Sequence, residues 1–167
     1  NGGEAIYIDT FEDWSICSYL LRRKHILFVV TGNSLVGLGH VYNTLLIAND
    51  ILNHQVTFLV DSNSELAYEL IQAKNYPVFI QKEDDILLDI NSFNPDVIVN
   101  DMLDSSTKYI MELKKCYSKV INFEDLGEGS KYADLVFNAI YPSPDTSLSS
   151  HFFGHNYFIL RDEFVLS

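Results

Sequence analysis

Basic residues are scarce in this sequence. Its 167 residues include 11 lysines and arginines against 23 aspartates and glutamates, which gives a formal net charge of −12. Duplex nucleic acid and anionic membranes both bind basic protein faces preferentially. We therefore expect no nucleic-acid partner and no membrane partner, and any anionic ligand must be held by local donors.

Cysteines are few, and long apolar runs are absent. Cys17 and Cys116 lie far apart among apolar neighbours, and no cysteine–histidine cluster has the spacing of a zinc site. We expect two buried thiols in a reducing cytoplasm and no metal site. Apolar runs such as Ile26–Val30 fall far short of the roughly 20 residues that cross a bilayer, and residues 1–4 do not resemble a signal peptide. The sequence predicts a cytoplasmic protein.

The chain nevertheless has the composition of a folded domain, with 47% hydrophobic and 20% charged residues. From His25 onward, short β-branched apolar runs alternate with longer helical periods, as in stacked βαβ units. Parallel strands that are covered on both faces are nearly all apolar. The sequence therefore predicts an α/β fold, a Rossmann-like doubly wound parallel sheet. Its predicted strands are Ile26–Thr31, Gln55–Val60, Pro77–Ile80, Val97–Asn100 and Val120–Phe123.

Helical segments separate these strands. After Tyr141 the composition becomes that of a linker, and Tyr157–Leu160 is predicted as a last strand. Four helix faces are predicted from apolar spacing: Val41, Leu45, Ala48 and Leu52; Leu66, Leu70 and Ala73; Ile86, Leu87, Ile90 and Phe93; Ile110, Leu113 and Tyr117.

The opening segment differs from the rest. Ile6–Ile8 is predicted as a short strand and Phe11–Arg23 as an amphipathic helix, with Thr10 and Asp13 placed for a capping box at its start. We therefore divide the chain into a strand-helix unit, residues 1–24, and a Rossmann-like domain, residues 25–167.

A glycine-rich loop runs from the first strand into the first helix of that domain. Its glycines allow the backbone to approach a ligand, and the helix N-terminus attracts an anion such as a phosphate or carboxylate. The loop lacks the third glycine of a dinucleotide fingerprint and the lysine of a Walker A loop, so no nicotinamide or other resident cofactor is expected. The predicted binding residues of the loop are Gly32, Asn33, Gly37, Leu38 and Gly39.

His40 lies where this loop enters the helix. Ligands of open α/β sheets bind at the carboxyl ends of the strands, so this position favours catalysis. A helix N-terminus disfavours the imidazolium, which predicts a neutral ring that accepts a proton from water. The alternative is a histidine that only caps the helix.

Acidic residues follow two further strands. Asp101 ends the fourth strand, and Glu124 and Asp125 follow the fifth, with Gly127 and Gly129 expected to keep that loop open. Carboxylates in a crevice can orient a histidine or bind sugar hydroxyls, whereas solvated loop acids would do neither. Asp104 is predicted mainly as a cap of the following helix.

These motifs, in this order, resemble the amino-terminal half of the UDP-sugar hydrolases of pseudaminic acid biosynthesis. The resemblance covers about residues 25–164 and includes Gly37-x-Gly39-His40, Ala133–Asn138 and Gly154–Arg161. It implies the two-domain GT-B architecture, a UDP-linked deoxyamino sugar as ligand, and a carboxyl-terminal domain that this chain lacks. It also implies that His40 activates the water that displaces UDP from the anomeric carbon.

The chain departs from that family at two positions. Asn43 stands where the family usually has an arginine, and Leu103 where it favours a tyrosine. We include Asn43 among the predicted substrate-binding residues, in the place of the family's arginine. A GT-B glycosyltransferase domain and a non-catalytic sugar-nucleotide-binding module fused to a cytidylyltransferase remain as alternatives.

The opening segment resembles a different family, the sialic-acid-type cytidylyltransferases at their carboxyl end. The similarity lies in Ile8–Trp14, with Tyr7 in place of the first aspartate of an Asp-Ile-Asp-Thr motif. The resemblance implies that residues 1–24 are the remnant of a preceding cytidylyltransferase domain.

Overall fold

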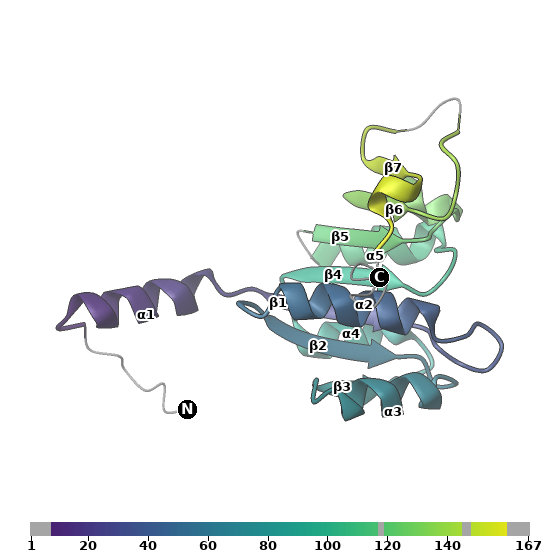
Figure 1. Cartoon of the computed structure of the whole chain (residues 1–167). Coiled ribbons are helices and arrows are strands. Elements are labelled where there is room, and N and C mark those ends of the chain that lie inside the picture. The colour runs from purple at the N-terminus through teal and green to yellow at the C-terminus, as the bar shows by residue number, and fades with distance from the viewer. Residues whose placement is uncertain (1–7, 117–118, 145–147, 160–167) are drawn as a thin grey trace, which may run out of the picture.

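A seven-stranded sheet forms the centre of the molecule (Figure 1). The computed structural model describes residues 8–116, 119–144 and 148–159. All neighbouring strands are parallel, in the order β3-β2-β1-β4-β5-β6-β7. The strands are β1 (His25–Val30), β2 (Gln55–Val60), β3 (Val78–Ile80), β4 (Val97–Asp101), β5 (Lys119–Phe123), β6 (Leu135–Asn138) and β7 (His151–Phe153). The predicted Rossmann-like α/β fold is confirmed.

Helices cover both faces of this sheet (Figure 1). One face packs against α2 and α3, and the other against α4 and α5. Strand order reverses between β1 and β4, so the segments that leave these two strands diverge to opposite faces, and ligands of such sheets bind at this point. The helices are α1 (Phe11–Arg22), α2 (Gly39–Asp50), α3 (Glu65–Ala73), α4 (Ile86–Phe93) and α5 (Thr107–Cys116), with short 3₁₀ helices η1 (Glu128–Tyr132) and η2 (His155–Tyr157).

Strand β1 shows why the central strands are continuously apolar. Phe28 faces α2 and α3 and stacks on Phe58 of β2, with 5.0 Å between ring centroids. Leu27 and Val29 face the opposite way and join the cluster that α4 and α5 cover. Each position in the strand therefore meets a packed layer, whichever way it points.

Two strands lie beyond the five predicted ones, and the predicted last strand is wrong. The sheet continues through β6 and β7, whereas His155–Tyr157 form η2. Gly154, with φ +91°, turns the chain directly after β7, and the Tyr157 ring then packs 5.3 Å from Phe152. Leu160, the end of the predicted strand, lies outside the described residues.

Two predicted helix faces need correction. Leu52 lies beyond the end of α2 and is 68% exposed, and α3 buries Ala67 and Ile71 rather than Leu66, which is 47% exposed, and Ala73. Small Ala67 faces inward because α3 lies close to the loop after β1, where the Ala67 N–H donates to the Gly32 carbonyl at 3.2 Å. The faces of α4 and α5 are confirmed, except for Tyr117, which lies outside the described residues.

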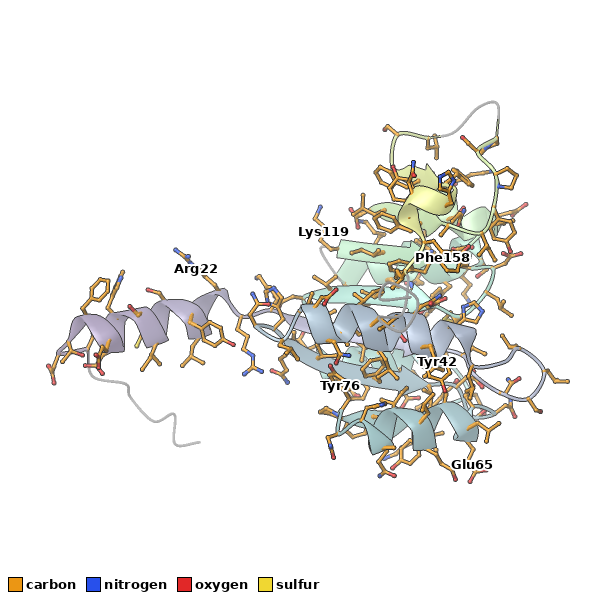
Figure 2. The ribbon with its side chains drawn as sticks, viewed as in Figure 1. Arg22, Tyr42, Glu65, Tyr76, Lys119 and Phe158 are labelled. Atoms are coloured by element: carbon orange, nitrogen blue, oxygen red, sulfur yellow. The ribbon has the colours of Figure 1, made fainter. Side chains whose placement is uncertain are left out.

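Helix α1 stands apart from the sheet (Figures 1 and 2). The predicted capping box is confirmed: the Asp13 N–H donates to Thr10 Oγ1 at 3.1 Å, and the Thr10 N–H donates to Asp13 Oδ2 at 2.9 Å. No residue of α1 is buried. Of the predicted strand before it, Ile8 has no strand conformation and Ile6 and Tyr7 lie outside the described residues.

The expected burial of the cysteines is wrong. Cys17 is only partly buried, in a helix that has no buried residue, and Cys116 is exposed as the last residue of α5. Within the described part of the chain, no helix combines the length and apolar character needed to cross a membrane.

Candidate functional site

The loop between β1 and α2 is shaped by its own polar groups. Asn33 Oδ1 accepts hydrogen bonds from the N–H groups of Leu35 and Val36, at 3.0 and 3.1 Å, and the Gly37 N–H donates to the Asn33 carbonyl at 2.8 Å. Gly37 has φ +85°, a left-handed conformation that favours glycine. Asn33 and Gly37 therefore hold the loop in shape.

The other two glycines of the loop have opposite surroundings. Gly32 is buried, and a Cβ there would lie 2.5 Å from Val41 Cγ2, so this glycine allows the loop and α2 to pack closely. Gly39, the first residue of α2, is exposed, and a Cβ there would meet nothing within 4 Å. No side chain caps α2 at Leu38, and its first turn contains no acid. The start of α2 is therefore open to an anionic ligand.

His40 and Asp101 form the centre of the site. Asp101 Oδ1 contacts His40 Nδ1, and the ends of their two segments are also joined because the Thr31 N–H donates to the Asp101 carbonyl at 3.2 Å. The side chain of His40 is 16% exposed and that of Asp101 is 0% exposed. A carboxylate that holds Nδ1–H leaves Nε2 as the nitrogen for a ligand.

The pKa of His40 shifts in the direction opposite to the one expected from the helix N-terminus. The hydrogen bond that His40 Nδ1–H donates to Asp101 raises the pKa of His40, burial opposes this, and the nearby charges of Asp101 and Glu124 raise it further. The expected preference for a neutral ring, based on the helix N-terminus alone, is wrong in direction because the buried carboxylate outweighs it. Burial in turn raises the pKa of Asp101, partly offset by His40.

Glu124 is the third member of what we call the histidine–carboxylate cluster (His40, Asp101 and Glu124). It follows β5 with φ +50°, its N–H donates to the Phe137 carbonyl at 2.8 Å, and its Oε1 accepts from the Ala139 N–H at 2.9 Å. Burial raises the pKa of Glu124, backbone donors oppose this, and Asp101 raises it further. Asp101 Oδ2 and Glu124 Oε2 are both buried and have no hydrogen-bond partner among the described residues.

Asp125 has a structural role instead. Its Oδ1 accepts from the N–H groups of Ser105 and Gly127 at 2.9 and 2.8 Å, and its Oδ2 accepts from Ser105 Oγ and Asn122 Nδ2 at 2.6 and 2.5 Å. With four donors on two oxygens, the buried Asp125 carboxylate has little capacity left for a ligand. It ties the loop after β4 to the loop after β5.

Asp104 and the two glycines after Asp125 also differ from expectation. Asp104 Oδ1 accepts from the Leu126 N–H at 3.0 Å, so Asp104 joins the two loops and does not cap α5. A Cβ at Gly127 would lie 2.3 Å from the Ser105 carbonyl oxygen, and one at Gly129 would lie 2.5 Å from the Ser106 carbonyl oxygen. These glycines let the loops pack tightly; they do not keep them open.

A row of buried asparagines near the carboxyl ends of three strands was not predicted. Asn100 Nδ2 donates to Asn122 Oδ1 at 2.8 Å, and Asn138 Oδ1 accepts from the Asp125 N–H at 2.9 Å. Tyr109 Oη donates to Asn100 Oδ1 at 2.8 Å, and burial raises the pKa of Tyr109. The available signal was an asparagine near the end of each of three otherwise apolar strands.

The two positions that depart from the resembled family lie in neighbouring segments. Asn43 is partly buried near the start of α2, three residues after His40 and so on the same side of the helix. Leu103, two residues after Asp101, is exposed and has φ +75°.

A pocket opens at the same edge of the sheet. It has a volume of about 360 Å³, within the range of small-molecule sites, and Asp61, Gln81 and Met102, which directly follow β2, β3 and β4, line it. Within the described part of the chain, no three histidine, cysteine or acidic residues are grouped so that they could hold a metal ion.

Comparison with known proteins identifies the architecture. No family model matches the chain. It is 28% identical over 151 residues to the uncharacterized protein MJ1062 of Methanocaldococcus jannaschii, and the aligned region covers 83% of this chain and 31% of that protein. MurG of Acinetobacter baumannii, in its crystal structure, superposes with a TM-score of 0.56 and 15% identity over 78% of this chain and 44% of MurG. The chain has a GT-B-like fold and spans less than half the length of each of these proteins.

Proposed function

We propose that this chain is the amino-terminal, GT-B-type domain of a nucleotide-sugar hydrolase that acts on a UDP-linked deoxyamino sugar in nonulosonic acid biosynthesis. The observation that carries the proposal is the pairing of His40 with buried Asp101, at the point where strand order reverses and beside an uncapped helix N-terminus. The motif resemblance supplies the substrate class.

The geometry supports a general-base role for His40. Its Nε2 accepts a proton from water as the water oxygen forms a bond to the anomeric carbon, and the bond between that carbon and the UDP oxygen breaks with its electrons leaving on UDP. Asp101 holds the ring and stabilises the imidazolium that forms, as the carboxylate does in a Ser-His-Asp triad. The open start of α2 offers N–H groups to the diphosphate.

Replacement of His40 tests this role. In a protein that carries this chain with the proposed carboxyl-terminal domain, His40→Ala is expected to lower UDP release from a UDP-sugar by about 10²–10⁴-fold, because a general base contributes that much. His155→Ala, in exposed η2, is the matched control and should keep wild-type activity. Wild-type turnover by His40→Ala would refute the assignment.

A glycosyltransferase is the second candidate, and the fold shared with MurG favours it. In this reaction His40 would take the proton from an acceptor hydroxyl instead of water. Measurement of UDP release with and without added acceptor sugars separates the two functions, since a hydrolase releases UDP in water alone.

For residues 1–24 we propose a separate origin, as the last helix of a preceding cytidylyltransferase domain. The exposure of α1 supports this, because Phe11 is 82% exposed, Leu21 is 85% exposed and Trp14 is also exposed. A helix that exposes large apolar side chains such as these normally packs against a partner.

A further inference from the structure

We propose that Glu124 binds the sugar: its Oε2, together with Oδ2 of Asp101, accepts hydrogen bonds from donor groups of the ring that His40 acts on. This inference rests on the proposed function and adds the chemistry of the sugar subsite. The donors would be hydroxyl, amide N–H or amino groups, all of which a deoxyamino sugar can carry.

Unpartnered oxygens are the first observation. Buried polar atoms in native proteins are almost always hydrogen-bonded, because an unpaired one loses its hydration without compensation. Glu124 Oε2 and Asp101 Oδ2 are the two buried side-chain oxygens that lack a partner within the described residues. Both belong to the histidine–carboxylate cluster, so the unmet acceptors gather at the proposed reaction centre.

The fixed orientation of Glu124 is the second observation. Its Oε1 accepts a hydrogen bond from the Ala139 N–H, and its own N–H donates to the Phe137 carbonyl. The next residue, Asp125, is fixed by the hydrogen bonds that its carboxylate accepts, so the left-handed backbone of Glu124 is held on both sides. A non-glycine residue in this conformation costs about 1–2 kcal/mol of backbone energy. Such strain persists only where the surroundings determine it, and it is common at ligand sites.

Charge determines which part of the ligand meets these oxygens. Two carboxylates repel a phosphate, whereas the open start of α2 attracts one. A nucleotide sugar presents an anionic diphosphate next to a ring rich in hydrogen-bond donors. The two parts of the ligand therefore bind at different places, the diphosphate at the start of α2 and the sugar ring at the ends of β4 and β5.

The test is an NMR titration of the chain with UDP and with UDP-N-acetylglucosamine, for wild type, Glu124→Gln and the matched control Glu128→Gln. Glu128 is exposed in η1, four residues from Glu124. Glutamine keeps the shape and can still accept from the Ala139 N–H, whose resonance reports that the loop is intact. We expect Glu124→Gln to weaken UDP-N-acetylglucosamine binding about tenfold or more and to leave UDP binding unchanged, because only the sugar contacts the lost carboxylate.

Each other result has a defined meaning. If wild type binds UDP-N-acetylglucosamine no more tightly than UDP, or if Glu124→Gln keeps the wild-type preference for the sugar nucleotide, the inference is overturned while nucleotide binding stands. If Glu124→Gln weakens both ligands equally, Glu124 has only a structural role and the inference is overturned. If wild type binds neither ligand, the inference is overturned, whereas the proposed function is decided separately by the activity of His40→Ala in the two-domain protein.

Discussion

His40 binds a proton more readily than a free imidazole because a fully buried carboxylate lies against its Nδ1. The same contact fixes the ring, so that orientation and basicity have one cause. A general base works best when its pKa lies near the working pH, and a raised pKa also makes the base stronger. However, His40 can accept a proton only when its ring is neutral, and the neutral form predominates at a pH above the pKa of His40.

Asp101→Asn tests this coupling. An asparagine can still hold Nδ1–H but carries no charge, so the pKa of His40 should fall, and an NMR titration of its ring protons measures the change. Because only the neutral ring accepts a proton, wild-type hydrolysis should rise with pH through the raised pKa of His40. In Asp101→Asn that rise should move to lower pH and reach a lower plateau, because the imidazolium has lost its stabilising partner. An unchanged His40 pKa would show that Asp101 does not control the base.

At the scale of elements, the segment that leads from β1 into α2 contains two glycines with different roles. Gly32 gives room for Val41, whereas Gly39 faces open space at the proposed diphosphate position. The sequence shows both as loop glycines and cannot distinguish them, since the difference depends on what packs against each.

Gly39→Ala should therefore raise stability and weaken binding. Alanine at a helical position is favoured over glycine by roughly 0.5–1 kcal/mol, and no atom within 4 Å opposes the added Cβ. The same Cβ would stand on the surface that a diphosphate approaches, so the affinity for UDP should fall. Gly32→Ala is the matched comparison and should lower the free energy of unfolding by about 1–3 kcal/mol through overpacking. Urea unfolding and UDP titration measure both effects, and unchanged UDP affinity in Gly39→Ala would place the diphosphate elsewhere.

The central elements were predictable from sequence, and the outer ones were not. β1 and β2 are buried on both faces and are nearly all apolar, whereas only two of the four residues of β6 are buried and β7 has three residues. The inward face of α3 was missed because Leu66 and Ala67 both fit a helical period, and the contact with Gly32 decides between them.

The candidate site was also predictable only in part. The edge of the sheet and the nearness of His40 to Asp101 follow from strand ends that meet in a parallel sheet. The different roles of Glu124 and Asp125 do not follow from the sequence. These adjacent acids of one loop differ in the backbone conformation at Glu124 and in the donors that surround Asp125.

At the scale of the whole molecule, α1 lies beyond the amino-terminal ends of the strands, whereas the proposed site lies at their carboxyl ends (Figure 1). The contacts after α1 are with His54 and Asp96, which precede β2 and β4, whereas the site lies where β1, β4 and β5 end. Arg22, near the end of α1, stands clear of the sheet in Figure 2. A preceding domain attached through α1 would thus leave the site uncovered.

Removal of residues 1–22 should leave the Rossmann-like domain as stable as before. Since α1 buries no residue, we expect the free energy of unfolding to change by less than about 0.5 kcal/mol, as for surface changes in general. Urea unfolding followed by circular dichroism measures this, with Ile110→Ala, in the buried core, as a control that should lose about 2–5 kcal/mol. A large loss on truncation would show that α1 belongs to this domain.

Both outer strands of the sheet, β3 and β7, are only three residues long. An edge strand presents unpaired backbone N–H and C=O groups on which a neighbouring chain can extend the sheet, and short edges limit that pairing. The long, strongly apolar strands lie in the interior of the sheet, where both of their edges are already occupied. The short outer strands therefore limit edge-to-edge pairing of the sheets of neighbouring molecules.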